Sequence, residues 1–238
     1  DECSPGEACN INLECVKVPA PIEFRLPAAP DSLAPDWVIH VDHDPEIHGG
    51  IGSGQTCLAF DGSEDFPNCY DEHHGSDFMI AGFDILEVAD IFPSAFAAMD
   101  AGEEVLAAAD GEVLAVQDGN YDRCHLDWQT WDVSCDGHPM SSNYVKLLHA
   151  GGYTSEYHHM RKGSIVVTVG QKVTCGQKLG LIGSSGYSTA PHIHFEVHDP
   201  SGQVMDPFAG PESQPESYWV QQEWNQLLPA PTCADAAD

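Results

Sequence analysis

Four polar side chains recur at every second position in one short stretch of the chain. In STAPHIHFEVH, residues 188–198, they are His192, His194, Glu196 and His198. A β-strand sends alternate side chains to one face, so all four would point the same way. Core strands bury apolar residues on such a face, whereas imidazole nitrogens and carboxylate oxygens are ligands that zinc takes in proteins. The spacing therefore predicts a strand that carries metal or acid–base chemistry.

Two upstream segments supply the same residue types. In CYDEHHGSDF, His73 and Asp77 stand four residues apart across a glycine. In SEYHHMRKGS, His158 and His159 end a predicted strand. A histidine pair by itself is not specific, because exposed histidines are common. The three segments together, in a β-rich chain, indicate one site.

The charge of the chain argues against two classes of partner. Among 238 residues, 38 are acidic and 8 are basic, for a net charge of −30. Such a surface repels nucleic acid and anionic membranes, so we expect neither as a partner. No run of 18 apolar residues is present, so we expect no membrane insertion. We interpret the acidic residues as a solvated surface.

Nine cysteines are scattered through the chain without a CxxC pair, which is typical of disulfides and an oxidising compartment. Cys57 and Cys69 bracket one loop of about a dozen residues, and we expect them to pair. We expect the same of Cys124 and Cys135, and the pairing of the other five stays open. The chain starts without Met or an apolar signal core, so we expect an exported protein, secreted or periplasmic, whose targeting segment has been removed.

The composition divides the chain into three parts. Residues 1–35 hold three cysteines and several prolines, which suits a disulfide-tied arm. Residues 36–212 hold the polar segments, and we predict one domain there. Residues 213–238 contain a short amphipathic piece and a polar tail.

The middle part has an all-β pattern. Short β-favouring runs alternate with Gly and Asn/Ser turns, which predicts an antiparallel sheet or sandwich with irregular, cysteine-containing flanks. Asp110–Gly111 predicts a hairpin turn within EEVLAAADGEVLAVQDG. Residues 90–102 are a short helix-prone insert. Further strands are expected at 143–149, 154–159, 165–169, 178–182 and 192–198.

HHGSD, YHHM and GSSGYSTAPHIHFEV resemble, in this order, the three signature blocks of the lysostaphin/LytM-type zinc endopeptidases. GEEVLAAADGEV and VTVGQKVTCGQKLGLIG also resemble segments of that family. The resemblance covers about residues 70–200, interrupted by an insert at 85–101. It implies a β fold of the lysostaphin (duplicated hybrid motif) kind and a metallopeptidase domain at 36–212. It also implies hydrolysis of peptide bonds in bacterial peptidoglycan, in bridge or stem peptides, often next to glycine.

The resemblance further implies the role of each site residue. One Zn²⁺ would be held by His73, Asp77 and His194. His159 and His192 would then lie beside the activated water, one as general base and acid, the other as a hydrogen-bond donor to the oxyanion. Which histidine has which role stays open.

The carboxylate ligand has two candidates. Asp77 follows His73 closely, and the intervening glycine allows both side chains to converge on one ion. Asp84, in AGFDI, also has the look of a metal aspartate on a strand. We prefer Asp77, because Asp84 would require a loop between the first histidine and the metal.

The remaining polar residues near the motifs have plainer interpretations. We expect Glu196 and His198 either to support the site from behind or to line the substrate groove. Strand alternation predicts that His74 and His158 turn to the opposite face. The segment at 40–48 is expected to be a loop over the groove. Solvated or capping roles are expected for His40, His43, His48, His125, His138 and His149.

Two other functions compete with a peptidoglycan endopeptidase. One is an inactive relative that binds cell wall or activates another hydrolase. The other is a general secreted metalloprotease acting on proteins. Every expected ligand and both partner histidines are present, which favours an enzyme. We expect a monomer whose substrate is a peptidoglycan peptide or a Gly-rich peptide.

Overall fold

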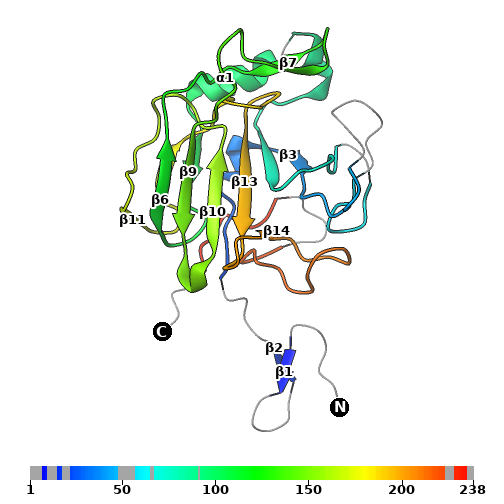
Figure 1. The fold of residues 1–238 in the computed structure, drawn as a ribbon, viewed down its shortest axis with the longest axis vertical. Coiled ribbons are helices and arrows are strands. Elements are labelled where there is room, and N and C mark those ends of the chain that lie inside the picture. The colour runs from blue at the N-terminus through cyan, green and yellow to red at the C-terminus, as the bar shows by residue number, and fades with distance from the viewer. Residues whose placement is uncertain are drawn as a thin grey trace.

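An antiparallel β-sheet dominates the protein (Figure 1). The computed structural model describes residues 7–9, 15–17, 22–47, 57–64, 67–90, 92–222 and 228–234. The largest sheet has eight strands in the order β11-β6-β9-β10-β13-β4-β3, and β14 pairs with β13. These strands are β3 (Leu33–Ile39), β4 (Ser76–Ile80), β6 (Gly111–Gln117), β9 (Tyr144–Leu148), β10 (Thr154–His158), β11 (Lys172–Val173), β13 (His192–His198) and β14 (Val204–Met205).

Smaller elements surround this sheet. Three two-stranded pairs are β1 (Glu7–Cys9) with β2 (Cys15–Lys17), β5 (Glu104–Leu106) with β12 (Lys178–Leu181), and β7 (His125–Asp127) with β8 (Asp132–Ser134). The helical elements are α1 (Pro93–Ala101) and the 3₁₀ turns η1 (Pro30–Ser32), η2 (Ile85–Asp90) and η3 (Ala150–Gly152). No helix among the described residues has the length and apolar character needed to cross a membrane. The predicted all-β class with one short helical insert is confirmed.

Strand β13 shows why the sheet forms here. Ile193, Phe195 and Val197 are fully buried, whereas the polar residues between them lie on the opposite face. Alternation of this kind fixes which face of a strand meets the core. The strand begins and ends as the sequence predicts, and its polar row lies on the face away from the apolar core, buried or half-buried.

The core extends into both predicted flanks. Phe24 and Trp219 are buried, and both rings contact Phe195 at 5.7 and 5.5 Å between centroids. Phe24 and Trp219 also form an isolated parallel bridge. Packing of aromatic rings at such distances contributes about 0.5–1.5 kcal/mol per pair beyond area burial. The packed unit therefore includes segments from 1–35 and 213–238.

The helical insert forms as predicted. Pro93 occupies the first turn of α1, and Gly102 ends the helix with a φ of 103°. Proline suits the first turn because its missing N–H has no partner there, and glycine adopts the left-handed conformation at low cost. Helix α1 and the β7–β8 hairpin lie together at one end of the sheet (Figure 1), and the Phe92 and Trp128 rings contact each other at 6.3 Å.

Two sequence predictions about strands are wrong. The Asp110–Gly111 turn does not close a hairpin, because β5 pairs with β12 while β6 pairs with β9 and β11. The chain changes sheets here: Ala107 exchanges backbone bonds with residues 176–177 instead of with β6. Residues 165–169 form no strand, since a single bond from Val166 N to Leu179 O (3.0 Å) is not continued into a ladder.

Three disulfides lie within the described residues. Cys57–Cys69 and Cys124–Cys135 are present, so both predicted pairs are confirmed. Cys175–Cys233, which the spacing does not reveal, closes 58 residues and ties the C-terminal segment to the domain. In the chain-entropy account, a loop of this length stabilises the fold by about 4 kcal/mol. Cys3 lies outside the described residues.

Two of the histidines expected to be solvated or capping are buried. His149 donates from one ring nitrogen to Asp110 O (2.7 Å), and its other nitrogen lies 2.7 Å from Ser155 Oγ. His40 is only 4% exposed. Because burial of a cation costs free energy, this exposure favours the neutral ring. His48 lies outside the described residues.

We expect His40 to make the fold acid-sensitive. Its ring lies 4.8 Å from both the Phe60 and Phe208 rings, and burial lowers its pKa to about 4. The unfolded chain binds this proton near pH 6.5, so stability is lost as pH falls from about 6.5 to about 4, by roughly 3 kcal/mol. Urea unfolding in chelator should therefore show a smaller loss between pH 7 and 4 for His40→Leu. Equal losses in both proteins would contradict this role.

Candidate active site

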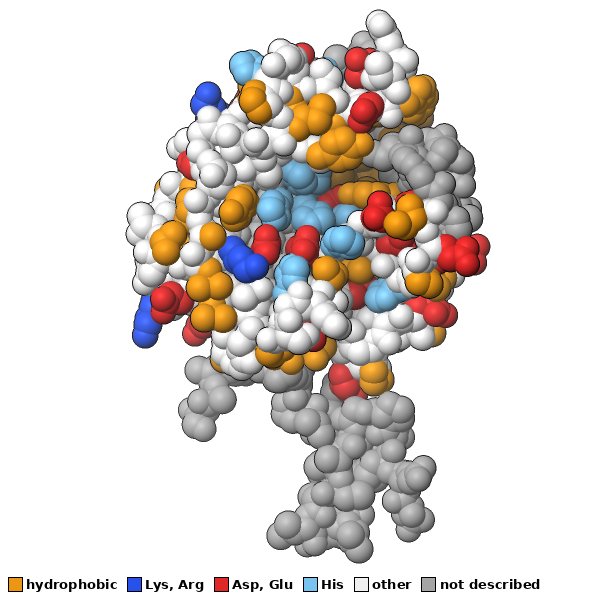
Figure 2. All heavy atoms as spheres, viewed as in Figure 1, with side chains coloured by type: hydrophobic (Ala, Val, Ile, Leu, Met, Phe, Trp, Pro, Cys, Tyr) orange, Lys and Arg blue, Asp and Glu red, His pale blue; other side chains and the backbone are white. Residues whose placement is uncertain are grey.

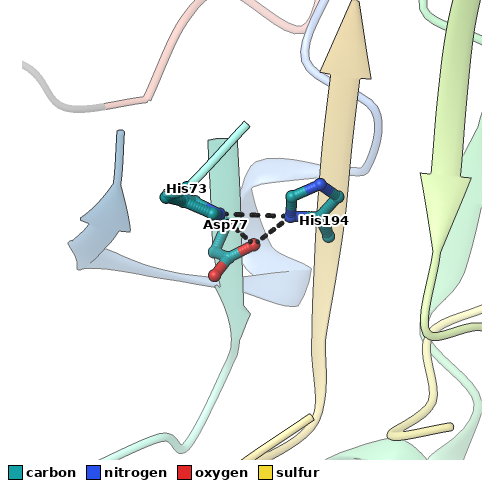
Figure 3. A group of neighbouring side chains, drawn as sticks. All are labelled: His73, Asp77 and His194. Atoms are coloured by element: carbon teal, nitrogen blue, oxygen red, sulfur yellow. Dashed lines mark hydrogen bonds and ion pairs between the residues drawn. The ribbon is translucent and has the colours of Figure 1, made fainter. Parts of the chain in front are cut away.

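Three side chains from separate parts of the sequence converge at one point (Figure 3). His194 Nδ1 lies 2.8 Å from Asp77 Oδ1, and His73 Nε2 lies 3.1 Å from the same oxygen. The two imidazole nitrogens are 3.1 Å apart. His73 and Asp77 are buried and His194 is half-buried. The structure thus brings together all three residues that the resemblance assigns to the metal.

Strand pairing sets two of these positions. In the antiparallel β4–β13 ladder, His194 is directly opposite Asp77. Residues opposite each other on one face have Cβ atoms about 5 Å apart, so their side chains meet without a long reach. Strand β3 covers the other edge of β4, with Ile39 opposite Asp77. Asp77 therefore lies in the interior of the sheet.

Gly75 allows the third position. A Cβ at this residue would lie 2.7 Å from two ring atoms of His194 and 2.8 Å from Phe195 O. Real Cβ atoms do not approach backbone so closely, so only glycine lets the chain pass over β13 between His73 and Asp77. The sequence suggests a sharp turn at this glycine, but the constraint is space for the His194 ring.

The segment before β4 orients His73. His73 Nδ1 donates to His40 O (2.7 Å), which leaves Nε2 for the cluster. Tyr70 stacks on the His73 ring at 4.3 Å, and its hydroxyl donates to Asp77 Oδ2 (3.4 Å). Asp42 N donates to His73 O (2.8 Å). The described part of the predicted 40–48 loop therefore holds His73 in place, and Tyr70 is a residue of the site that no sequence motif signals.

His159 and His192 present one nitrogen each to the same place. Their rings are 4.6 Å apart. His159 Nδ1 donates to Ser185 O and His192 Nδ1 donates to Ala190 O, both at 2.7 Å. Because a carbonyl only accepts, each neutral ring has its proton on Nδ1 and a bare Nε2. His192 Nε2 lies 3.4 Å from Asp77 Oδ1, and Figure 2 shows histidine side chains gathered in a hollow of this face.

The prediction for His158 is wrong. His158 is directly opposite His194 in the β10–β13 ladder, and their rings lie 5.8 Å apart on the same face. The next residue, His159, has a φ of 60°, so it leaves the strand and also turns its ring toward the site. Strand alternation therefore fails at this step. His74 is exposed while His73 is buried, as predicted.

Asp84 does not reach the cluster. It is exposed, and its Oδ1 accepts a hydrogen bond from Leu86 N (2.8 Å) at the start of η2. The described geometry therefore favours Asp77 as the carboxylate of the site.

The site is electrostatically polarised. Burial alone would raise the pKa of Asp77, but the charges and hydrogen bonds of the surrounding imidazoles outweigh burial and hold this pKa well below its usual value. Burial would lower the pKa of His194, but hydrogen bonds and charges from Asp77 and Glu196 raise it to about 9. Burial and the neighbouring imidazoles hold the pKa of His159 well below its usual value. The cluster therefore pairs an ionised carboxylate with an imidazole whose protonated form is favoured at neutral pH, and a metal that binds at Nδ1 would displace that proton.

Comparison with known families agrees with this arrangement. Residues 94–207 match Peptidase family M23. Nearly half of the chain therefore matches an M23 peptidase domain. This match includes His159, His192 and His194 but begins after His73 and Asp77. The assignment of His73 and Asp77 to the cluster therefore rests on the geometry of the structure and not on this match.

Several proteins resemble parts of the chain. Peptidoglycan DD-endopeptidase ShyA of Vibrio cholerae is 43% identical over 65 residues, 27% of this chain and 15% of that protein. Glycyl-glycine endopeptidase ALE-1 of Staphylococcus capitis is 32% identical over 98 residues, 41% of this chain and 22% of that protein. The catalytic domain of lysostaphin from Staphylococcus simulans is 26% identical, covering 66% of this chain and 86% of that structure, with a TM-score of 0.36. The chain spans less than a quarter of ShyA or ALE-1.

The roles that the resemblance implies for these histidines predict different outcomes for alanine variants. His194→Ala should abolish stoichiometric zinc binding, because it removes a ligand. His192→Ala and His159→Ala should retain zinc and lose turnover by about 100-fold or more, because they remove only proton transfer or oxyanion stabilisation. Zinc content and turnover of the purified variants test these predictions. His74→Ala, which changes an exposed histidine, is the control and should keep both zinc and turnover. A zinc-free His192→Ala protein would mean that the roles are reversed.

Proposed function

We propose that this chain is a zinc-dependent endopeptidase that hydrolyses peptide bonds in bacterial peptidoglycan. The observation that carries the proposal is the cluster of His73, Asp77 and His194 with two further histidines beside it. Each of those two, His159 and His192, offers a bare Nε2. The M23 match over 94–207 supports peptidase chemistry.

The donor set fits zinc. Two imidazole nitrogens and one carboxylate oxygen are a common ligand set of catalytic zinc, with a further position left open. Bonds of about 2.0–2.1 Å in a tetrahedron place ligand atoms about 3.3 Å apart. The three separations here, 2.8, 3.1 and 3.1 Å, lie slightly below this edge. When bound, zinc would supply Lewis acidity that activates water and polarises the scissile carbonyl.

The two flanking histidines would move the protons. With Nδ1 tied to a backbone carbonyl, each ring can accept a proton only at Nε2, the nitrogen that faces the cluster. Burial and the neighbouring imidazoles lower the pKa of His159, so that ring is neutral near pH 7 and its Nε2 has a free lone pair. One of the two rings would accept a proton from water and return it to the leaving amine. A protonated or donating imidazole on the other side can stabilise the developing oxyanion.

Relatives guide the choice of substrate. The names of ShyA and ALE-1 give two bond types, a peptidoglycan DD-peptide bond and a glycyl-glycine bond. Peptides of peptidoglycan, cut near glycine or within stems, therefore form the proposed substrate class for this chain. We also propose that it acts as a monomer outside the cytoplasm, since three disulfides suit an oxidising compartment.

An inactive relative is not favoured. Loss of function in such proteins goes with loss of ligands, whereas here the three donors converge and both partner histidines lie beside them. A general protease would share this site, so substrate comparison has to separate the two.

Digestion of purified peptidoglycan tests the proposal. We expect release of new amino groups from sacculi, abolished by a chelator, restored by one equivalent of zinc, and absent in His192→Ala. Casein and elastin serve as protein substrates under the same conditions. Faster digestion of casein than of sacculi would favour the general protease, and no hydrolysis of any substrate by the zinc-loaded protein would contradict an enzyme.

A further inference from the structure

Glu196 links His194 to a third histidine on the same face of β13. Its Oε2 accepts from His194 Nε2 (3.2 Å), and its Oε1 accepts from His198 Nε2 (2.6 Å). His198 is held in turn through Nδ1 by Gly202 O (3.2 Å). The side chains of all three are less than one-fifth exposed, so these contacts are shielded from water.

His194 differs from the other histidines of the site in which nitrogen points inward. His73, His159 and His192 each donate from Nδ1 to a backbone carbonyl, which leaves Nε2 free. The Nε2 atoms of His73 and His192 lie 3.1 and 3.4 Å from Asp77 Oδ1. His194 turns Nδ1 toward Asp77 and Nε2 outward. A backbone carbonyl fixes the tautomer of the first three histidines. For His194, the acceptor of the outer N–H is instead a side-chain carboxylate, that of Glu196.

This contact determines which nitrogen of His194 can bind a metal. A ligating nitrogen must be free of its proton, so a neutral His194 that binds through Nδ1 must have its proton on Nε2. A carboxylate that accepts from Nε2 favours that tautomer, fixes the ring plane and makes the inner nitrogen a better donor. Without Glu196, the ring would lose its partner on the outer side and the preference for this tautomer.

We propose that Glu196 is a positioning residue that holds the proton of His194 on Nε2 and so presents Nδ1 to the metal. The inference rests on the zinc site proposed above. His198 fixes the second oxygen of Glu196, which keeps the carboxylate in the orientation that His194 requires.

A neighbouring carboxylate provides a matched control. Glu156 is directly opposite Glu196 in the β10–β13 ladder and is similarly shielded. Its oxygens accept from Lys146 Nζ (2.7 Å) and His158 Nε2 (2.9 Å), and its Oε1 lies 3.7 Å from His198 Nε2. None of these three residues belongs to the cluster. Glu156→Gln therefore removes the same charge from the same face without removing a partner of a ligand.

The test measures zinc dissociation constants by competition with a chromophoric chelator for wild type, Glu196→Gln, Glu196→Ala and Glu156→Gln. We expect Glu196→Ala to bind zinc about 10- to 100-fold more weakly. Glu196→Gln should bind zinc with an affinity between those of wild type and Glu196→Ala, because its amide oxygen still accepts a hydrogen bond but has no charge. Glu156→Gln should stay within about twofold of wild type, since it leaves the contacts of His194 intact.

A second readout follows the proton itself. In zinc-loaded protein labelled at histidine nitrogens, the Nε2–H signal of His194 should be visible in wild type and Glu156→Gln. It should be lost to exchange with water in Glu196→Ala. Unfolding midpoints measured in chelator show whether each variant folds. If Glu196→Ala does not fold, the zinc affinity of Glu196→Gln is the test.

The outcomes separate this inference from the proposed function. Tight zinc binding by wild type with unchanged affinity in both Glu196 variants would overturn only the role of Glu196. An equal loss in Glu156→Gln would do the same, because it would show a general charge effect. Absence of zinc binding by wild type would overturn the proposed function and this inference with it.

Discussion

The antiparallel register between β13 and its two neighbours is the constraint on which the site depends. It places His194 opposite Asp77 on one side and opposite His158 on the other. A shift of one residue would turn His194 into the core and bring Ile193 to the surface, because side chains alternate between faces. The apolar residues of β13, all fully buried, make that shift costly. The same packing that stabilises the sheet therefore also determines which imidazole meets which carboxylate.

Hydrogen bonds on the outer side of the site orient the imidazole rings. Each imidazole has one nitrogen bonded outward, and the nitrogen left over points inward. Three of these outward partners are backbone carbonyls, of His40, Ser185 and Ala190, supplied by loops that the sheet and the Cys57–Cys69 loop hold near β4 and β13. Because a carbonyl never donates, it selects one tautomer at any pH where the ring is neutral. The loops thus set the chemistry of the histidines without contributing a reactive group.

Some of this arrangement could be predicted from sequence and some could not. The bounds of β13, the grouping of His73, Asp77 and His194, and two disulfides follow from period, spacing and motif. The positions of His158 and His159 do not, because His159 has a positive φ and leaves the strand, so both rings face the site, which no alternation rule includes. Strand pairing of Asp110–Gly111 fails for a similar reason: a local turn signal cannot show that the chain changes sheets. Tyr70 and the carbonyl partners leave no trace in sequence, since any residue offers a carbonyl and only the fold places it.

The location of the metal tests this account most directly. Crystals of the protein grown with one equivalent of zinc, measured on both sides of the zinc absorption edge, would locate the ion independently of any activity. The account predicts one anomalous peak about 2.0–2.2 Å from His73 Nε2, Asp77 Oδ1 and His194 Nδ1. A peak bound by Asp84, or by His194 through Nε2, would contradict it.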